Sequence, residues 1–190
     1  GTGGNVFENV EPLYMTDDFI LGFDHVFAGI DFGWFPDVFS FTKCAFNASQ
    51  RDLYIFAEYR CNKQSNKQVF DKLYHELKYA GRPFMLPDEI VTCDSAEPKS
   101  ISDLKSYGAY GARPAKKGPD SINYSMKWLQ SLNHIYIDPN RCPGHLKEFV
   151  EYEYERDRDD EVISGYPDEN NHSIDSCRYG LERYWTRRGQ

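Results

Sequence analysis

The sequence Val26-Phe27-Ala28-Gly29-Ile30-Asp31-Phe32-Gly33-Trp34 is an apolar run that reaches a single acid, Asp31, and then a glycine. The turn-forming residues 35–37 come next, and a second apolar run extends from Val38 to Phe46. This pattern predicts a strand, a tight turn and a returning strand. A carboxylate in so apolar a strand is costly to bury unless it is paired or binds a metal. An aspartate that caps the turn explains Asp31 equally well.

The composition indicates one globular domain. The chain has 190 residues, of which 40% are apolar and 16% aromatic, enough for one sizeable core. No apolar run approaches the roughly 20 residues that span a bilayer, so we expect no membrane partner. Five cysteines, at positions 44, 61, 93, 142 and 177, never form a C-x-x-C pair. They are typical of reduced thiols in a cytosolic protein.

The net charge of −8 does not exclude a polyanionic partner, because the charge is unevenly distributed. Residues 151–161 hold seven acids and two arginines, a local charge of −5, which leaves −3 for the rest of the chain. Divalent cations bound by other carboxylates would lower the negative charge of the working surface further.

Strands are predicted in close succession at Val26 to Gly33, Val38 to Phe46 and Leu53 to Tyr59. These segments are rich in Phe, Tyr, Val and Ile, and short turns separate them, so we expect an antiparallel meander. Residues 66–79 then carry apolar side chains at helical spacing, and Gly81 is expected to end that helix.

Strands and helices alternate in the second half of the chain. We expect a strand at 89–94, a helix from Pro98 to Gly108 with Ser95 as N-cap, a strand at 112–116, helices at 122–132, 143–150 and 171–187, and a strand at 134–137. Apolar and acidic residues alternate from Val150, which predicts a β-hairpin arm over 150–164 with a charged tip. This order predicts a mixed sheet, three antiparallel strands with parallel additions, flanked by helices.

Three acids occupy related positions. Asp31 ends the first strand, Asp94 ends the fourth, and Asp175 lies in the first turn of the last helix. Ligand sites of open α/β sheets lie beyond the carboxyl ends of the strands, so we expect these acids to converge. Their oxygen atoms favour hard cations such as Mg²⁺ or Mn²⁺. Two such ions about 4 Å apart can hydrolyse a phosphodiester.

Other polar residues are weaker candidates. His172 shares a helix face with Asp175, where it would carry a proton or bind the metal. Glu97 and Asp168 are candidates for contact with the metal or its ligands, and Lys99 for contact with a phosphate. Four basic residues are candidate contacts to DNA phosphates: Lys116, Lys117, Arg187 and Arg188.

Each candidate also has an ordinary structural explanation. Asp94 could cap the next helix, and His172 and Asp175 could form a plain helix start, where acids are common. The other charged candidates could be solvated surface. Spacing alone leaves these alternatives open.

Three segments carry a family resemblance: Gly29-Ile30-Asp31-Phe32-Gly33, Thr92-Cys93-Asp94-Ser95-Ala96-Glu97-Pro98-Lys99-Ser100, and residues 170–179, Asn-Asn-His-Ser-Ile-Asp-Ser-Cys-Arg-Tyr. They resemble the three acidic motifs of the nuclease domain of the large terminase subunit of tailed double-stranded DNA bacteriophages. The third motif is the most specific. The resemblance covers nearly the whole chain.

The resemblance implies a ribonuclease H-like fold and a metal-dependent endonuclease that cuts concatemeric viral DNA in the host cytoplasm before and after capsid filling. It implies Asp31, Asp94 and Asp175 as ligands of Mg²⁺ or Mn²⁺, with two ions, and His172 as an auxiliary. The implied partners are double-stranded DNA, the terminase small subunit and the portal protein. We see no recognition helix or zinc finger, so little sequence preference is expected.

The opening Gly1 to Phe7 resembles the segment that joins this nuclease to the preceding packaging ATPase. Residues 1–24 are therefore expected to be an extended lead-in and 25–190 the nuclease domain. No G-x-x-x-x-G-K-[ST] phosphate loop occurs, so ATP hydrolysis is not expected of this piece.

The arm, including Tyr154, Arg156 and Arg158, is expected to overhang the acids and limit access of DNA. Two alternative functions remain at this point. One is another nuclease of the same fold, such as a junction resolvase or ribonuclease H. The other is a non-catalytic interaction domain.

Overall fold

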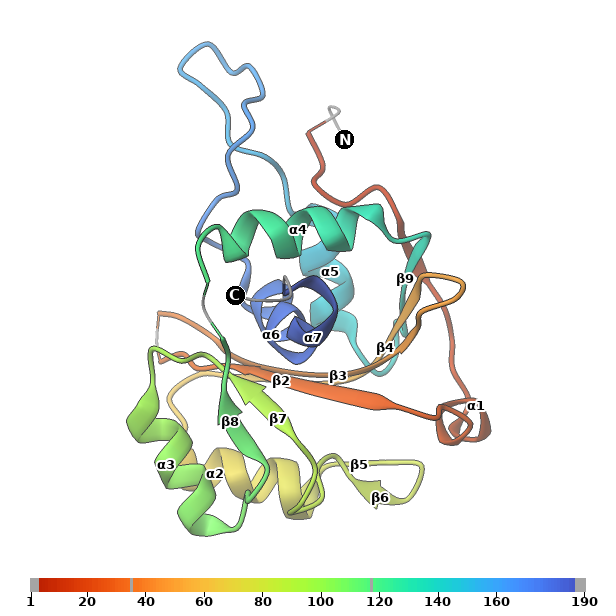
Figure 1. The fold of residues 1–190 in the computed structure, drawn as a ribbon, viewed down its shortest axis with the longest axis vertical. Helices are drawn as coiled ribbons and strands as arrows, with labels where there is room; N and C mark the ends of the chain where they lie inside the picture. The colour runs from red at the N-terminus through yellow and green to blue at the C-terminus, as the bar shows by residue number, and fades with distance from the viewer. Residues whose placement is uncertain (1–3, 35, 117, 187–190) are drawn as a thin grey trace.

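A computed structural model describes residues 4–34, 36–116 and 118–186. Its central feature is a seven-stranded sheet of order β1-β9-β4-β3-β2-β7-β8 (Figure 1). The strands are β1 Val10–Pro12, β2 Val26–Asp31, β3 Phe39–Asn47, β4 Asp52–Cys61, β7 Val91–Cys93, β8 Ala112–Pro114 and β9 His134–Ile137. Strands β2, β3 and β4 form an antiparallel meander, and the others join by parallel pairing. The predicted mixed sheet is confirmed.

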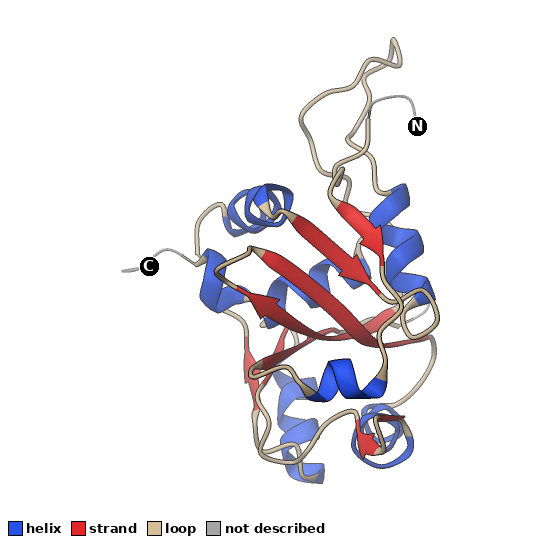
Figure 2. Cartoon of the chain, turned by 90° about the vertical axis from the view of Figure 1, so that its right-hand side faces the viewer, coloured by secondary structure: helices blue, strands red, loops and turns tan. Residues whose placement is uncertain are grey.

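Helices cover both faces of the sheet (Figures 1 and 2). One face carries α4 Ser121–Ser131, α5 Pro143–Glu151, α6 His172–Gly180 and α7 Glu182–Trp185. The other carries α2 Asn66–Asp71, its π-helical continuation η1 Lys72–Glu76, α3 Pro98–Tyr107, and the small hairpin of β5 Lys78–Tyr79 and β6 Arg82–Pro83. The short α1 Asp17–Leu21 precedes β2. None of the described helices is long and apolar enough to cross a bilayer.

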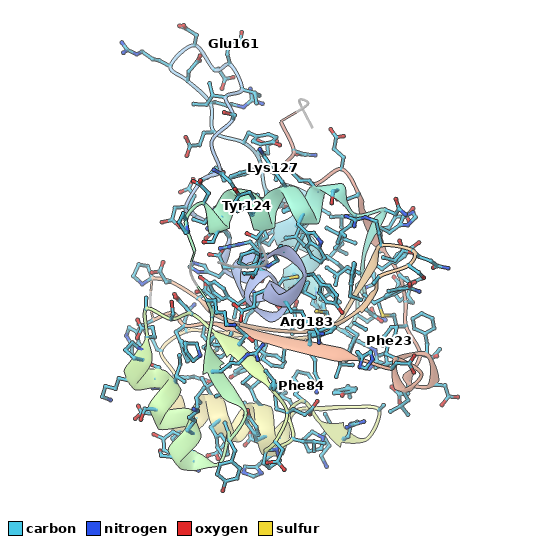
Figure 3. The ribbon with its side chains drawn as sticks, viewed as in Figure 1. Phe23, Phe84, Tyr124, Lys127, Glu161 and Arg183 are labelled. Atoms are coloured by element: carbon cyan, nitrogen blue, oxygen red, sulfur yellow. The ribbon has the colours of Figure 1, made fainter. Side chains whose placement is uncertain are left out.

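Each face of the sheet has its own apolar core, and side chains fill both layers (Figure 3). Phe41 of β3 is fully buried in the core shared with α2 and α3, and the labelled Phe84 belongs to the same layer. Cys44, also on β3, is buried in the second core with Phe149 of α5 and Ile174 of α6. Strand β3 thus alternates between the two cores, as the period of two requires.

The segment before residue 25, expected to be an extended lead-in, contributes the strand β1 and the short helix α1 to the fold. Strand β1 pairs in parallel with β9, and Val6 and Phe7 are only 3% and 4% exposed. The Asn9 side chain donates hydrogen bonds to the carbonyls of Leu129 and Leu132 at the end of α4, 2.9 Å each. A three-residue edge strand is too short to show a period in the sequence, and its partner lies far along the chain.

Helix ends also differ from the prediction. The helix that begins at Asn66 ends at Glu76, and Ala80 and Gly81, with φ of 48° and 77°, form the turn between β5 and β6. Gly81 is therefore a turn residue and not a helix stop. The expected last helix is two helices, because Leu181 leaves helical geometry at φ −105° and ψ 13°. At α3 the N-cap is Glu97 and not Ser95, whereas Pro98 and Gly108 bound the helix as predicted.

The predicted arm is present, but it is not a regular hairpin. Its chain doubles back at residues 157–161, with a β-bridge between Arg156 and Val162. The alternating segment from Tyr152 to Tyr154 is extended as predicted, but its partner is the N-terminal segment. Val6 N–H donates to the Tyr152 carbonyl and Tyr154 N–H to the Gly4 carbonyl, at 3.0 and 2.8 Å.

Helix α6 rests directly on the backbone of β2. A Cβ placed on Gly29 would lie 1.9 Å from the Ser176 carbonyl oxygen and 2.6 Å from the Gly180 nitrogen. A Cβ on Gly180 would in turn lie 3.0 Å from the carbonyl carbon of Ala28. Two glycines therefore allow a helix and a strand to approach more closely than side chains permit.

We predict that Gly29→Ala lowers the free energy of unfolding by about 2 kcal/mol or more, because the added methyl group meets rigid backbone. Gly22→Ala is the control, since Gly22 has φ −79° and an added Cβ would lie 3.3 Å from its nearest neighbour. Urea unfolding monitored by tryptophan fluorescence measures both. Equal stability of the two variants would contradict the close contact.

Candidate active site

Asp31 and Asp94 are brought together by the parallel pairing of β2 and β7. Ile30 is in register with Cys93, so the two aspartates follow at the same edge of the sheet. The Asp94 N–H donates to the Ile30 carbonyl at 3.1 Å, which continues the pairing past the end of β7. Asp31 is 6% exposed. The two acids therefore occupy neighbouring carboxyl ends, where ligand sites of α/β sheets form.

Helix α6 adds His172 and Asp175 to this edge. A hydrogen bond joins Nδ1 of His172 to Oδ2 of Asp31 at 3.0 Å. Nε2 of the same ring lies 3.7 Å from Oδ1 of the exposed Asp37, on the loop after β2. Asp175, one turn further along α6, is close enough for its charge to act on Asp31. The structure thus brings together four residues predicted from the sequence.

Asp175 is paired with Arg178, a residue of the third motif for which the sequence analysis predicted no role. Nε and Nη2 of Arg178 donate to Oδ1 of Asp175 at 3.2 and 2.7 Å. Nη1 donates to the hydroxyl of Ser125 in α4 at 2.9 Å. The guanidinium is 5% exposed. The i,i+3 spacing on one helix was the available signal for this pair.

The charges at this edge are strongly affected by burial. Burial raises the pKa of Asp31 to about 6, although the hydrogen bond from His172 opposes this. Burial also raises the pKa of Asp175, against the opposing effect of Arg178. The hydrogen bond to Asp31 raises the pKa of His172. Both carboxylates therefore lie where an additional positive charge would stabilise their ionised forms.

These residues line a cleft of about 560 Å³, here called the acidic cleft. Its walls come from the ends of β2 and β7, from α4 and α6, and from the base of the arm. The polar and aromatic residues of its lining include Asp31, Asp94, Lys116, Tyr152, Tyr166, Asp168, His172, Asp175 and Arg178. Asp168 accepts a hydrogen bond from the side chain of Asn171 at 3.3 Å.

The remaining sequence candidates lie elsewhere. Glu97 lines a separate hollow beside Trp34, and Lys99 is 89% exposed and paired with Asp103 at 3.4 Å. The structure does not bring these two residues to the acidic cleft. Lys116 lines the cleft, as stated, whereas Lys117, Arg187 and Arg188 lie outside the described residues.

The arm contributes only its base to the cleft, through Tyr152, and Tyr166, two residues after the arm, lines the cleft beside it. The arm projects away from the sheet and helices in both views and does not overhang the acids as expected (Figures 1 and 2). Tyr154 is fixed by a hydrogen bond between its hydroxyl and Gln130 at 2.6 Å. Arg156 donates to the Asp160 carbonyl at 2.8 Å, and Arg158 is exposed at the tip.

The donor set of the acidic cleft fits a hard divalent cation in chemistry, because it consists of carboxylate oxygens and one imidazole. In their present rotamers, no three His, Cys, Asp or Glu side chains among the described residues are gathered closely enough to hold an ion. Asp31 Oδ2 accepts from His172, and Asp175 Oδ1 accepts from Arg178. Both carboxylates therefore already have a hydrogen-bonded partner at this edge.

Comparison with known proteins identifies the family. A family model described as the terminase RNase H-like domain matches residues 31–183. The chain belongs to this family. All five cysteines are free, as the absence of C-x-x-C pairs indicated.

Individual terminases agree with this assignment. The chain is 34% identical to the large terminase subunit of Bacillus phage SPP1 over 186 residues, 96% of this chain and 42% of that protein. It is 26% identical to the PBSX phage terminase large subunit of Bacillus subtilis (strain 168), over 82% of this chain and 34% of that protein. The chain thus spans less than half the length of these relatives.

A solved structure extends the comparison to the fold. The nuclease domain of the SPP1 large terminase, with bound Mn, matches with a TM-score of 0.83 and 33% identity, covering 93% of this chain and 97% of that domain. The large terminase nuclease of the thermophilic phage G20c, with bound magnesium, matches with a TM-score of 0.59 at 14% identity, over 96% of this chain and 99% of that one. The second likeness shows the fold alone. The ribonuclease H-like fold of the terminase family is confirmed.

We predict that Arg178→Ala lowers the free energy of unfolding at pH 7 by about 3 kcal/mol, because it leaves the buried Asp175 carboxylate without its partner. Lys99→Ala, which removes an exposed pair on α3, is the control and should leave stability unchanged. Chemical denaturation measures both. An Arg178→Ala protein as stable as the wild type would show that the ion pair is dispensable.

Proposed function

We propose that this chain is a metal-dependent endonuclease that cuts concatemeric double-stranded viral DNA during genome packaging, with little sequence preference of its own. The convergence of Asp31, Asp94, Asp175 and His172 on one cleft supports this proposal most directly. The raised pKa values of Asp31 and Asp175 support it as well, because a bound cation would offset the cost of burying their charges. The SPP1 nuclease domain, solved with Mn, is the relevant relative.

In this proposal Asp31, Asp94 and Asp175 hold two divalent cations, Mg²⁺ or Mn²⁺. When bound, such ions lower the pKa of water and stabilise the leaving oxygen of the phosphodiester. The fold contributes by fixing the positions of these three aspartates. Asp31 and Asp94 are held by strand pairing, and Asp175 is held by α6.

His172 has a proton-transfer role in the proposal. Its Nδ1 is bound to Asp31, which orients the ring and leaves Nε2 as the atom that exchanges protons with the cleft. Asp168, on the cleft wall, supports this end of α6 through Asn171. Arg178 contributes a buried positive charge close to both Asp175 and Asp31.

The proposed substrate and partners follow from the family. Lys116, at the cleft wall, is a candidate contact to a DNA phosphate. We propose that the protein acts in the cytoplasm of the infected bacterium, with the terminase small subunit and the portal protein. A packaging ATPase domain in the same polypeptide is consistent with the 42% coverage of the SPP1 large subunit.

The arm is proposed to limit access of long DNA to the acidic cleft. Its base forms part of the cleft wall, and its tip extends beyond the body of the domain (Figure 1). A long duplex that leaves the cleft on this side would meet the acidic tip, whereas a short duplex would not reach it. Access control in this form needs no contact between the tip and the three aspartates.

The nuclease assignment predicts that Asp31→Asn, Asp94→Asn and Asp175→Asn each reduce Mn²⁺-dependent nicking of supercoiled plasmid by more than about 100-fold. Removing a group that only supports a metal ligand costs at most about 100-fold, and removing a ligand itself should cost more. Asp71→Asn, on the opposite face in α2, is the matched control and should cut normally. Circular dichroism verifies folding. Full activity of any one of the three variants would refute its assignment as a ligand.

A substrate panel separates this function from its alternatives. Linear duplex should be cut, and a four-way junction or an RNA–DNA hybrid should not be preferred over it. Preference for the junction would favour a resolvase, and preference for the hybrid would favour ribonuclease H. If calorimetry detects no binding of Mn²⁺ or Mg²⁺, a non-catalytic interaction domain is favoured.

The arm proposal predicts that replacing residues 157–161 with two glycines raises the initial rate of plasmid cleavage and leaves cleavage of a short duplex unchanged. A full-length arm carrying Asp159→Asn, Asp160→Asn and Glu161→Gln separates the effect of charge from that of bulk. Asp157 is kept in this control because its Oδ1 accepts from the N–H groups of Asp159 and Glu161. If the protein with the shortened arm cleaves plasmid at an unchanged initial rate and with an unchanged cut pattern, the proposal is contradicted.

A further inference from the structure

Strand β3 places two hydroxyl groups beneath α6 in the interior of the domain. Ser40 and Thr42 are 0% and 1% exposed, and they alternate with Phe39 and Phe41, which face the other core. A buried hydroxyl without a hydrogen-bond partner destabilises the folded state. The chain nevertheless uses hydroxyls here, and all of them are hydrogen-bonded to groups on α5 or α6.

Thr42 connects α6 to α5 and β4. Its hydroxyl oxygen lies 2.6 Å from the Ser176 hydroxyl and 2.6 Å from Nε2 of His145, which is fully buried. Nδ1 of His145 lies 2.9 Å from Oε1 of Glu58, which also accepts from the His145 N–H at 2.7 Å. With Nδ1–H donating to Glu58, Nε2 accepts from the Thr42 hydroxyl. The Ser176 hydroxyl has two acceptors within reach of its one proton, the Thr42 hydroxyl at 2.6 Å and the Ser173 carbonyl at 3.0 Å.

The Glu58 carboxylate anchors the far end of this row of bonds. Burial raises its pKa, but the hydrogen bonds from His145 and Gly144 outweigh this and hold the pKa of Glu58 below its usual value. The backbone N–H groups of Gly144 and His145, which donate to Glu58, lie in the first turn of α5, where the helix dipole favours a negative charge. Glu58 is therefore the ionised cap of α5.

A second set of bonds holds the first turn of α6. Oε2 of Glu148, on α5, accepts the backbone N–H of Ile174 at 2.7 Å. The side chain of Asn171, the N-cap residue of α6, accepts no backbone hydrogen bond from the helix. Glu148 provides an acceptor for the first turn in its place. Arg60 of β4 donates both to Oε1 of Glu148 and to the Ser173 hydroxyl.

These contacts surround the two functional residues of α6. Ser173, Ile174 and Ser176 carry the bonds, and His172 and Asp175 lie between or beside them in the sequence. Although the row Ser176–Thr42–His145–Glu58 has the residue types of a hydrolytic triad, its serine and histidine are 0% exposed. Neither residue lines the acidic cleft. Substrate access is absent, and a positioning role is what the geometry permits.

We propose that the buried polar network of Thr42, Ser176, His145, Glu58 and Glu148 positions α6 so that Asp175 and His172 face Asp31. These are positioning residues for the proposed nuclease site, so the inference rests on that function. The network joins α6 to β3, β4 and α5 at once.

The need for directional bonds follows from helix geometry. The contact between Gly29 and Gly180 sets how closely α6 approaches β2, but two glycines offer nothing that resists sliding or rotation. A shift by one residue moves a helical side chain by about 1.5 Å along the axis and about 100° around it. Such a shift would turn Asp175 out of the cleft. Hydrogen bonds at Ser173, Ile174 and Ser176 oppose both movements.

The test compares Mn²⁺ affinity by calorimetry, plasmid nicking and melting temperature. Thr42→Val keeps the shape of the side chain and removes its hydroxyl, and Ser176→Ala removes the other end of the bond. Each should weaken Mn²⁺ binding by about tenfold, the loss typical of groups that orient metal ligands. The loss in the double variant should be smaller than the sum of the two single losses, because both changes remove the bond between Thr42 and Ser176.

Two controls separate positioning from stability. Thr42→Ser retains the hydroxyl and should restore wild-type Mn²⁺ affinity. Val69→Ala, in α2 on the opposite face, is buried and should lower the melting temperature without changing Mn²⁺ affinity. If Thr42→Val fails to fold, Ser176→Ala alone gives the comparison, since it removes a single oxygen atom.

The outcomes are distinct. Weakened Mn²⁺ binding in Thr42→Val and Ser176→Ala, with Thr42→Ser and Val69→Ala normal, supports the proposal. If the wild type binds Mn²⁺ and cuts DNA while Thr42→Val and Ser176→Ala lose only thermal stability, the network serves stability alone and this inference is wrong. A wild type that neither binds Mn²⁺ nor cuts DNA would overturn the proposed function as well.

Discussion

The backbone contact between α6 and β2 is the constraint on which the site depends. Gly29 and Gly180 let the helix lie against the strand with no side chain between them. This brings the first turn of α6 to the carboxyl end of β2, where Asp31 lies. Any residue larger than glycine at position 29 would lift the helix and separate His172 from Asp31. The short sequence Gly29-Ile30-Asp31 therefore specifies both the acid and the surface on which its partners are mounted.

The aspartates of the acidic cleft place negative charges at partly buried positions, and neighbouring positively charged or hydrogen-bonding groups partly offset the cost of burying them. Arg178 binds Asp175 and is itself held by Ser125 of α4, while His172 binds Asp31. These partners leave the pKa values of both aspartates raised, so the compensation is incomplete. A divalent cation would supply the remaining charge. The same low solvent exposure would strengthen its interaction with a phosphodiester.

Much of the fold could be predicted from local patterns. The meander of β2, β3 and β4 followed from short aromatic and β-branched runs, and α3 from Pro98 and Gly108. The convergence of Asp31 and Asp94 followed from the rule that ligand sites lie at the carboxyl ends of strands. The meeting of these acids with Asp175 needed the docking of α6, which the order of elements only suggested.

Features that depend on distant partners could not be predicted. Strand β1 is three residues long and pairs with β9, more than a hundred positions away. The alternation around Tyr152 correctly indicated an extended chain but not its partner, which is the segment from Gly4 to Val6. The bond from Arg178 to Ser125 of α4 and the network through Thr42 and His145 require knowing which elements face one another. Such contacts leave no period in the sequence.

The central claim is that Asp31, Asp94 and Asp175 share divalent cations at the edge of β2 and β7. A crystal structure of the protein grown with Mn²⁺, with anomalous diffraction measured near the manganese edge, tests it most directly. The account predicts anomalous peaks in the acidic cleft, with carboxylate oxygens of all three aspartates within about 2.0–2.6 Å, the range spanned by the oxygen ligands of hard cations. An anomalous map with no peak between these aspartates, at a Mn²⁺ concentration that supports cleavage, would contradict the claim that they share divalent cations.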